Sequence, residues 1–152
     1  MTAAPGATLV YTLNVSNNGA LAIGTFTATY TNAAAITIND NAAATPYPVT
    51  ITVAGLPPVQ KATAQLLGFN HTYPRDVDTI LVGPTGAKSW LMSDPGGTTA
   101  VTNVNLTFDD AAAGTVSCST GPASGTYKPT DCTDAFGTDV FRLRLTLRAC
   151  VP

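Results

Sequence analysis

A turn signal between two short apolar runs constrains the fold of this chain more than any other feature. Gly83-Pro84-Thr85-Gly86 combines residues that favour tight turns. The runs on either side, Asp76–Val82 and Lys88–Met92, have the length and composition of strands. We therefore predict a hairpin here, followed by a strand over Val104–Phe108 whose large apolar side chains share one face.

Alternation of apolar and polar residues predicts further strands along the chain. These are Thr8–Ser16, Thr25–Tyr30, Ala35–Asn39, Val49–Val53, Gln60–Phe69 and Val140–Ala149. Within Gln60–Phe69, we expect Ala62, Ala64 and Leu66 to face the core. By contrast, Gly114–Pro129 is rich in Gly, Ser and Thr, and it predicts a loop pinned by a cysteine.

The choice of acidic residues argues against helices. All nine acidic residues are Asp, and Asp favours turns and caps whereas Glu favours helix interiors. We therefore predict an all-β chain, an antiparallel β-sandwich of the jelly-roll type with about eight to ten strands. The 152 residues suffice for one domain over 1–152, in which residues 1–32 form an edge hairpin or one exchanged between copies.

The low charge of the chain excludes one class of partner. A net charge of −2 without a basic cluster gives no electrostatic basis for nucleic-acid binding. No apolar run approaches the length of a membrane span. We expect neither a nucleic-acid partner nor a membrane-spanning segment.

Three cysteines predict a disulfide rather than a zinc site. Cys118, Cys132 and Cys150 form no C-x-x-C pair, and a single histidine cannot complete a zinc set. A Cys118–Cys132 bond would close a 15-residue loop, worth about 3 kcal/mol in the chain-entropy model. Cys150 is the alternative partner, or it forms a bond between chains.

The run from His71 to Gly86 has the pattern H-T-Y-x-x-D-V-x-x-x-L-x-x-P-x-G. This pattern resembles the signature of the P-domain that follows the catalytic domain in subtilisin-like proprotein convertases. Asp76, Pro84 and Gly86 match that signature, whereas Arg75 replaces its glycine.

The chain is more similar to P-domain-like modules of secreted bacterial proteins. The matching runs are Leu91–Gly97, Leu106–Ala112 and Ser124–Pro129, and the likeness covers about Ile36–Pro129. The final strand lacks the Gly-x-Trp-x-Leu run usual in that family. The resemblance implies a non-catalytic module, secreted or at the cell surface, that stabilises or attaches to a larger assembly. Its partners would be other protein domains or copies of itself.

The single histidine limits the catalytic chemistry available. Any Ser-His-Asp arrangement must include His71, and the chain has no G-x-S-x-G elbow. We expect His71 to have a structural role at a strand end and the protein not to be an enzyme.

Clustered carboxylates suggest calcium as a ligand. The candidate ligands are Asp76, Asp78, Asp94, Asp109 and Asp110, at expected strand ends or in loops. Ca²⁺ takes several oxygen ligands, and the glycines that follow Asp94 would let backbone carbonyls turn toward an ion. The alternative is that these side chains cap turns.

Two other functions fit the sequence. Low charge, a leftover cysteine and a detachable N-terminal strand suit a self-assembling subunit of an extracellular filament or surface layer, joined by strand exchange. Carbohydrate binding on an aromatic platform is less favoured, since Trp90 is the sole tryptophan. Arg142, Arg144 and Arg148 form a row on the final strand that either binds anions or, more commonly, blocks edge pairing.

Overall fold

The computed structural model describes residues 10–17, 26–39, 42–55, 59, 61–133 and 145–150. Its strands are β1 (Val10–Asn17), β2 (Phe26–Asn32), β3 (Val49–Thr52), β4 (Lys61–His71), β5 (Thr79–Val82), β6 (Lys88–Ser93), β7 (Val101–Phe108), β8 (Gly125–Tyr127), β9 (Thr130–Asp131) and β10 (Leu145–Cys150). One short 3-10 helix, η1, covers Pro74–Asp76. The described residues are therefore all-β, as predicted, and they include no helix that is long and apolar enough to cross a membrane.

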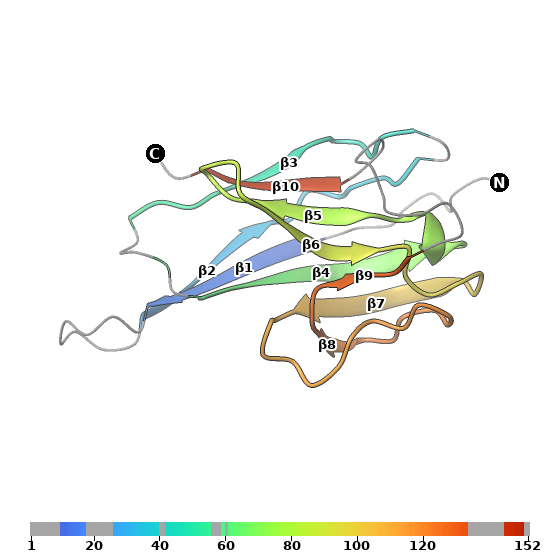
Figure 1. The fold of residues 1–152 in the computed structure, drawn as a ribbon. Helices are drawn as coiled ribbons and strands as arrows, with labels where there is room; N and C mark the ends of the chain where they lie inside the picture. The colour runs from blue at the N-terminus through green and yellow to red at the C-terminus, as the bar shows by residue number, and fades with distance from the viewer. Residues whose placement is uncertain are drawn as a thin grey trace.

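The strands form two five-stranded sheets, which lie one over the other in Figure 1. The β4 sheet has the order β2-β1-β4-β7-β8, and the β5 sheet has the order β3-β10-β5-β6-β9. Both sheets are mixed, because β7–β8, β6–β9, β10–β3 and β10–β5 are parallel pairs. The prediction of purely antiparallel sheets was wrong, since alternation within a strand carries no information on the direction of its partner.

Apolar side chains from both sheets meet between the layers. The buried cluster is Ile36, Val49, Ile51, Val53, Ala64, Leu66, Phe69, Val77, Leu91, Met92, Val101, Val104, Leu106, Phe108 and Val116. Val104, Leu106 and Phe108 are all buried, which confirms the predicted apolar face of β7. Because the two layers share this cluster, the sheets stabilise each other by burial of apolar surface.

A bulge changes which residues of β4 face the core. Ala64 and Leu66 are buried as predicted, but Ala62 is exposed. The register between β4 and β7 shifts after Leu66, where Gly68 has a φ of 68°. The extra residue reverses the alternation, so that Phe69 rather than residue 68 is buried, with no exposed surface.

β5 and β6 form the predicted hairpin around the Gly83–Gly86 turn. The amide of Gly83 donates to the carbonyl of Ala87 at 2.8 Å, and that of Gly86 donates to the carbonyl of Gly83 at 3.0 Å. Gly86 has a φ of 85°, a conformation that glycine adopts without steric cost.

Four predicted segments differ from the structure. The predicted strand Asp76–Val82 begins only at Thr79, because Asp76 belongs to η1. Ala35–Asn39 forms only an isolated bridge between Thr37 and Thr45 instead of a strand. The predicted loop over Gly114–Pro129 contains β8, which joins the β4 sheet at its edge. In the predicted Val140–Ala149 strand, β10 begins at Leu145, and residues 140–144 lie outside the described part of the chain.

The edges of the two sheets are held together on one side by hydrogen bonds from β2. The Tyr30 hydroxyl donates to the carbonyl of Ala54 at 2.9 Å, and Asn32 Nδ2 donates to the carbonyl of Thr50 at 3.1 Å. On another side, β8 and β9 follow each other along the chain yet belong to different sheets. A short connection thus joins the two sheets there.

Candidate functional site

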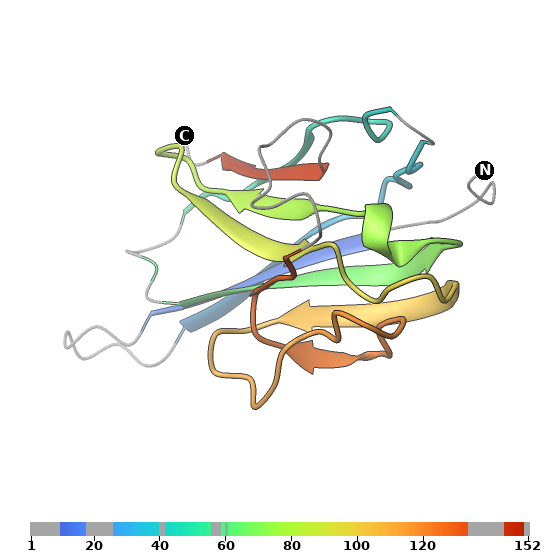
Figure 2. The same ribbon diagram turned by 45° about the vertical axis from the view of Figure 1, so that its right-hand side comes forward.

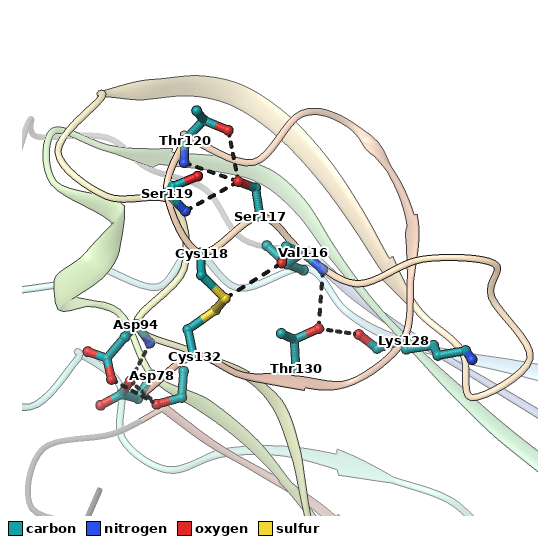
Figure 3. Close-up of a disulfide and its surroundings, with 11 residues drawn as sticks. Asp78, Asp94, Val116, Ser117, Cys118, Ser119, Thr120, Lys128, Thr130 and Cys132 are labelled. Carbon is teal, nitrogen blue, oxygen red and sulfur yellow. Dashed lines mark hydrogen bonds between the residues drawn. A yellow bond between two sulfur atoms is a disulfide. The ribbon is translucent and has the colours of Figure 1, made fainter. Parts of the chain in front are cut away.

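A disulfide closes a ring that contains both β8 and β9 (Figure 3). The bond joins Cys118 to Cys132, whose Cα atoms are 5.5 Å apart, so this pairing is the first of those considered from the sequence. Cys132 is buried, and its amide donates to the carbonyl of Ser93 at 3.1 Å. The ring therefore attaches the loop after β7 to the end of β6.

The side-chain hydroxyl of Thr130, a residue of the disulfide ring, makes two hydrogen bonds that stabilise the ring. Its hydroxyl accepts a hydrogen bond from the amide of Val116 at 3.1 Å and donates one to the carbonyl of Lys128 at 2.7 Å. Thr130 is buried, and so is Val116. A buried hydroxyl that both donates and accepts avoids the penalty of an unsatisfied polar group.

Two glycines after β6 let the ring approach closely. A Cβ at Gly96 would lie 2.7 Å from Pro122 Cδ, and one at Gly97 would lie 2.6 Å from the carbonyl oxygen of Ser119. Both have positive φ, 81° and 59°, and the amide of Gly96 donates to the carbonyl of Ser117 at 2.7 Å. These glycines are needed for packing against residues 117–122.

Asp78 and Asp94 lie beside Cys132 (Figure 3), and together with Ser93, which contacts both carboxylates, they form an acidic cluster. The buried Ser93 hydroxyl is 2.9 Å from Asp78 Oδ1 and 3.4 Å from Asp94 Oδ2. The amide of Asp94 also donates to Asp78 Oδ1, at 3.2 Å. The cluster gathers carboxylate and hydroxyl oxygens, the atoms that bind hard cations in proteins.

The structure brings together two of the five candidate calcium ligands, Asp78 and Asp94. Asp76 ends η1 and is exposed, and Asp110 is exposed in the turn after β7. β6 and β7 run in opposite directions in Figures 1 and 2, so Asp94 and the Asp109–Asp110 pair follow strand ends on opposite sides of the molecule. Among the described residues, no group of three or more His, Cys, Asp or Glu side chains is placed to hold a metal ion.

Asp109 pairs with a lysine. Its Oδ2 is 2.8 Å from Lys61 Nζ, and its Oδ1 accepts a hydrogen bond from the amide of Ala111 at 2.8 Å. The hydrogen bond from Lys61, followed by that from Ala111, holds the pKa of the Asp109 carboxyl below its ordinary value. Asp109 therefore combines a turn-capping role with an ion pair between β7 and the start of β4.

The structure also describes two other side chains singled out from the sequence, His71 and Trp90. His71 Nδ1 accepts a hydrogen bond from the amide of Tyr73 at 3.0 Å, which places the imidazole at the turn after β4. Trp90 is half-buried on β6. Arg142 and Arg144 lie outside the described residues, and for Arg148 only the backbone position in β10 is described.

Sequence reasoning missed Ser93 and Lys61 as members of these sites. Ser93 directly precedes Asp94, and a hydroxyl next to a candidate ligand is a signal that could have singled it out. Lys61 lies 48 residues from Asp109, and no local pattern connects them. Only the pairing of β4 with β7 brings the two charges together.

Comparison with known proteins gave no further information on this site. No family model matches the chain, and neither a curated protein nor a solved structure matches it.

Proposed function

We propose that this protein is a non-catalytic extracellular module that stabilises or attaches to a larger secreted or surface assembly. The observation that carries the proposal is the Cys118–Cys132 disulfide. Disulfides persist in oxidising compartments and are rare in the reducing cytosol. The bond joins the connection between β7 and β8 in one sheet to the residue that follows β9 in the other, and a cross-link of this kind supports a stabilising role.

The finer proposal is a P-domain-like sandwich of the jelly-roll type. It is supported by where the family-like runs lie in the fold. Leu91–Gly97 spans the end of β6 and the loop that contains Gly96 and Gly97, Leu106–Ala112 covers the end of β7, and Ser124–Pro129 contains β8. Ser124–Pro129 lies within the disulfide ring, Leu106–Ala112 pairs with it through β7 and β8, and Leu91–Gly97 accepts a hydrogen bond from Cys132 at Ser93.

Two measurements test this proposal. The purified chain should not hydrolyse peptide or ester substrates above a buffer blank. Hydrolysis that His71→Ala abolishes would contradict the non-enzymatic role. Thiol titration of the unfolded, unreduced protein should find one reactive thiol, that of Cys150, whereas three would contradict an oxidised extracellular form.

A second candidate function is a self-assembling subunit joined by strand exchange. The position of β1 bears on it, because β1 lies between β2 and β4 and pairs with both along most of its length. A donated β1 would therefore complete a neighbouring sheet through two sets of backbone hydrogen bonds. Light scattering and negative-stain microscopy at high protein concentration test this function. Filaments would support it, and a strictly monomeric protein would exclude it.

A further inference from the structure

Three asparagines of the chain begin Asn-x-Ser/Thr triplets, the acceptor pattern for N-linked glycans. They are Asn14, Asn70 and Asn105. Such triplets arise by chance in a Thr-rich chain, so the pattern alone selects none of them. A site that carries a glycan in the folded protein must also have its side chain at the surface, because the glycan is bulky. The structure describes the side chains of Asn70 and Asn105, whereas for Asn14 it describes only the backbone, in β1.

Asn70 uses both polar atoms of its side chain within the fold. Its Oδ1 accepts a hydrogen bond from the amide of Asn103 at 2.8 Å, and its Nδ2 donates to the carbonyl of Gly68 at 2.6 Å. The side chain is half-buried where the register between β4 and β7 shifts. A sugar on Nδ2 would have to fit inside this bulge, against the carbonyl that Nδ2 contacts.

Asn105 presents its side-chain amide in a different way. It lies on β7 and is exposed, between the buried Val104 and Leu106. Its Oδ1 accepts a hydrogen bond from the amide of Gly68 at 2.8 Å, and only the oxygen of a side-chain amide can accept such a bond. The bulge therefore fixes which way the amide group is turned. None of the hydrogen bonds between Asn105 and other described residues uses Nδ2.

The position of this triplet in the sheet sets when it can be modified. β7 is paired on both sides, with β4 and with β8, and the hydroxyl of Thr107 accepts a hydrogen bond from Gln65 Nε2 at 3.2 Å. An enzyme cannot surround a triplet in a strand that is paired on both sides, so a glycan must be transferred before these strands pair. The folded structure then determines whether the glycan is tolerated, and the exposed side chain of Asn105 meets that condition.

We infer that Asn105 is an N-glycosylation site and that its glycan stands on the outer face of the β4 sheet. The donor is an oligosaccharide linked to a lipid pyrophosphate. A bond forms between Nδ2 and C1 of the first sugar, the bond from C1 to the pyrophosphate oxygen breaks, and Nδ2 gives one proton to a base of the transferase. This inference rests on the proposed function, because the transfer takes place on the route by which proteins reach the cell surface.

The test expresses the chain behind a cleavable signal peptide in a eukaryotic secretory host. An Asn14→Gln background removes the triplet whose side chain lies outside the described residues. Peptide mapping by mass spectrometry, before and after peptide N-glycosidase, should locate one glycan, at Asn105. Asn105→Gln and Thr107→Val should each abolish it, whereas Thr107→Ser, which keeps the triplet, should retain it. Asn70→Gln is the matched control and should leave the glycan unchanged.

The glycan map of the chain without changes at residues 105 and 107 is decisive even where a variant fails to fold. Asn105 without a glycan overturns the inference. Equal occupancy of Asn70 and Asn105 in the folded protein overturns it too, since the position in the fold would then make no difference. Thiol titration of the same samples separates the inference from the proposed function. One reactive thiol without a glycan contradicts the inference alone, whereas three reactive thiols contradict the extracellular module as well.

Discussion

At the scale of single residues, Ser93 determines how Asp78 and Asp94 are arranged. Its hydroxyl has no exposed surface and lies between oxygens of both carboxylates. Asp94 has a φ of 48°, a left-handed conformation that Asp tolerates better than most residues. The hydrogen bond from its own amide to Asp78 compensates for part of that conformational cost.

Calcium binding at this cluster stays a prediction, and it is now confined to two of the five carboxylates. If Ca²⁺ binds there, ten times its dissociation constant should stabilise the protein by about 1.4 kcal/mol. That corresponds to a rise in Tm of roughly 3–6 °C for a domain of this size. Asp94→Asn and Asp78→Asn should abolish the rise.

The matched control is Asp110→Asn, at a carboxylate that follows the opposite strand end. It should leave the effect of Ca²⁺ on Tm intact. Differential scanning calorimetry with Ca²⁺ and with chelator measures each difference. Identical Tm values in both conditions would leave these residues as turn formers.

The Lys61–Asp109 pair predicts a small dependence of stability on pH. The pKa of Asp109 is lowered in the folded protein, while in the unfolded chain it is about 3.9. The pair therefore contributes stability fully above that value and loses it as the pH falls through the lower folded pKa. Because Lys61 is partly exposed and screened by solvent, the contribution is at most about 1 kcal/mol.

Urea unfolding of Asp109→Asn and the wild type measures this contribution. The free energies of unfolding should differ at pH 7 and converge as the pH falls below the lowered pKa of Asp109, where both side chains are neutral. Asp110→Asn, at the neighbouring exposed carboxylate, should show no such convergence. A difference for Asp109→Asn that persists unchanged at low pH would contradict the role of the ion pair.

At the scale of elements, local patterns predicted the strands and the hairpin but not their partners. Val49–Val53 lies where alternation predicted a strand and buries Val49 and Ile51, whereas Lys88–Met92 lies where the turn signal predicted the returning strand of the hairpin. The burial of Phe69 was missed, since the bulge at Gly68 depends on β7. The amide of Gly68 donates to Asn105 Oδ1, and a sequence pattern within β4 cannot show that contact.

The cysteines of the disulfide ring could be predicted from the sequence, but the packing of the ring against the loop of Gly96 and Gly97 could not. The sequence placed both cysteines and left Cys150 as an alternative partner. It could not show that Gly96 contacts Pro122 or that the predicted loop carries β8 and β9. The two candidate ligands that meet, Asp78 and Asp94, come from the segments before β5 and after β6, so the predicted hairpin alone accounts for their proximity.

Gly96→Ala tests how closely the ring must pack on this loop. A Cβ at Gly96 would lie 2.7 Å from Pro122 Cδ and 3.1 Å from the carbonyl oxygen of Thr120. We expect a loss above the roughly 1–2 kcal/mol that positive φ alone costs a non-glycine residue. Gly86→Ala is the matched control, because Gly86 has a similar φ and open space around it. Equal losses in thermal unfolding of the two variants would show that the crowding has no energetic effect.

At the scale of the whole molecule, the two sheets depend on strands from opposite ends of the described chain. β1 is an inner strand of the β4 sheet, and β10 is an inner strand of the β5 sheet. Neither sheet is therefore complete until a terminal strand has joined it. Such long-range pairing is the part of a fold that local sequence patterns specify least.

Removal of β10 gives the clearest test of this dependence. β10 lies between β3 and β5 and is parallel to both, so a chain that ends at residue 144 would leave both strands with unpaired backbone groups. Because an unsatisfied buried backbone group costs about 1–3 kcal/mol, we expect the truncated chain to lose its cooperative thermal transition. A synthetic peptide of residues 140–152, added in trans, should restore part of that transition, whereas a scrambled peptide of the same composition should not. If the truncated chain melts at the wild-type temperature, β10 cannot be the strand that holds β3 to the rest of its sheet.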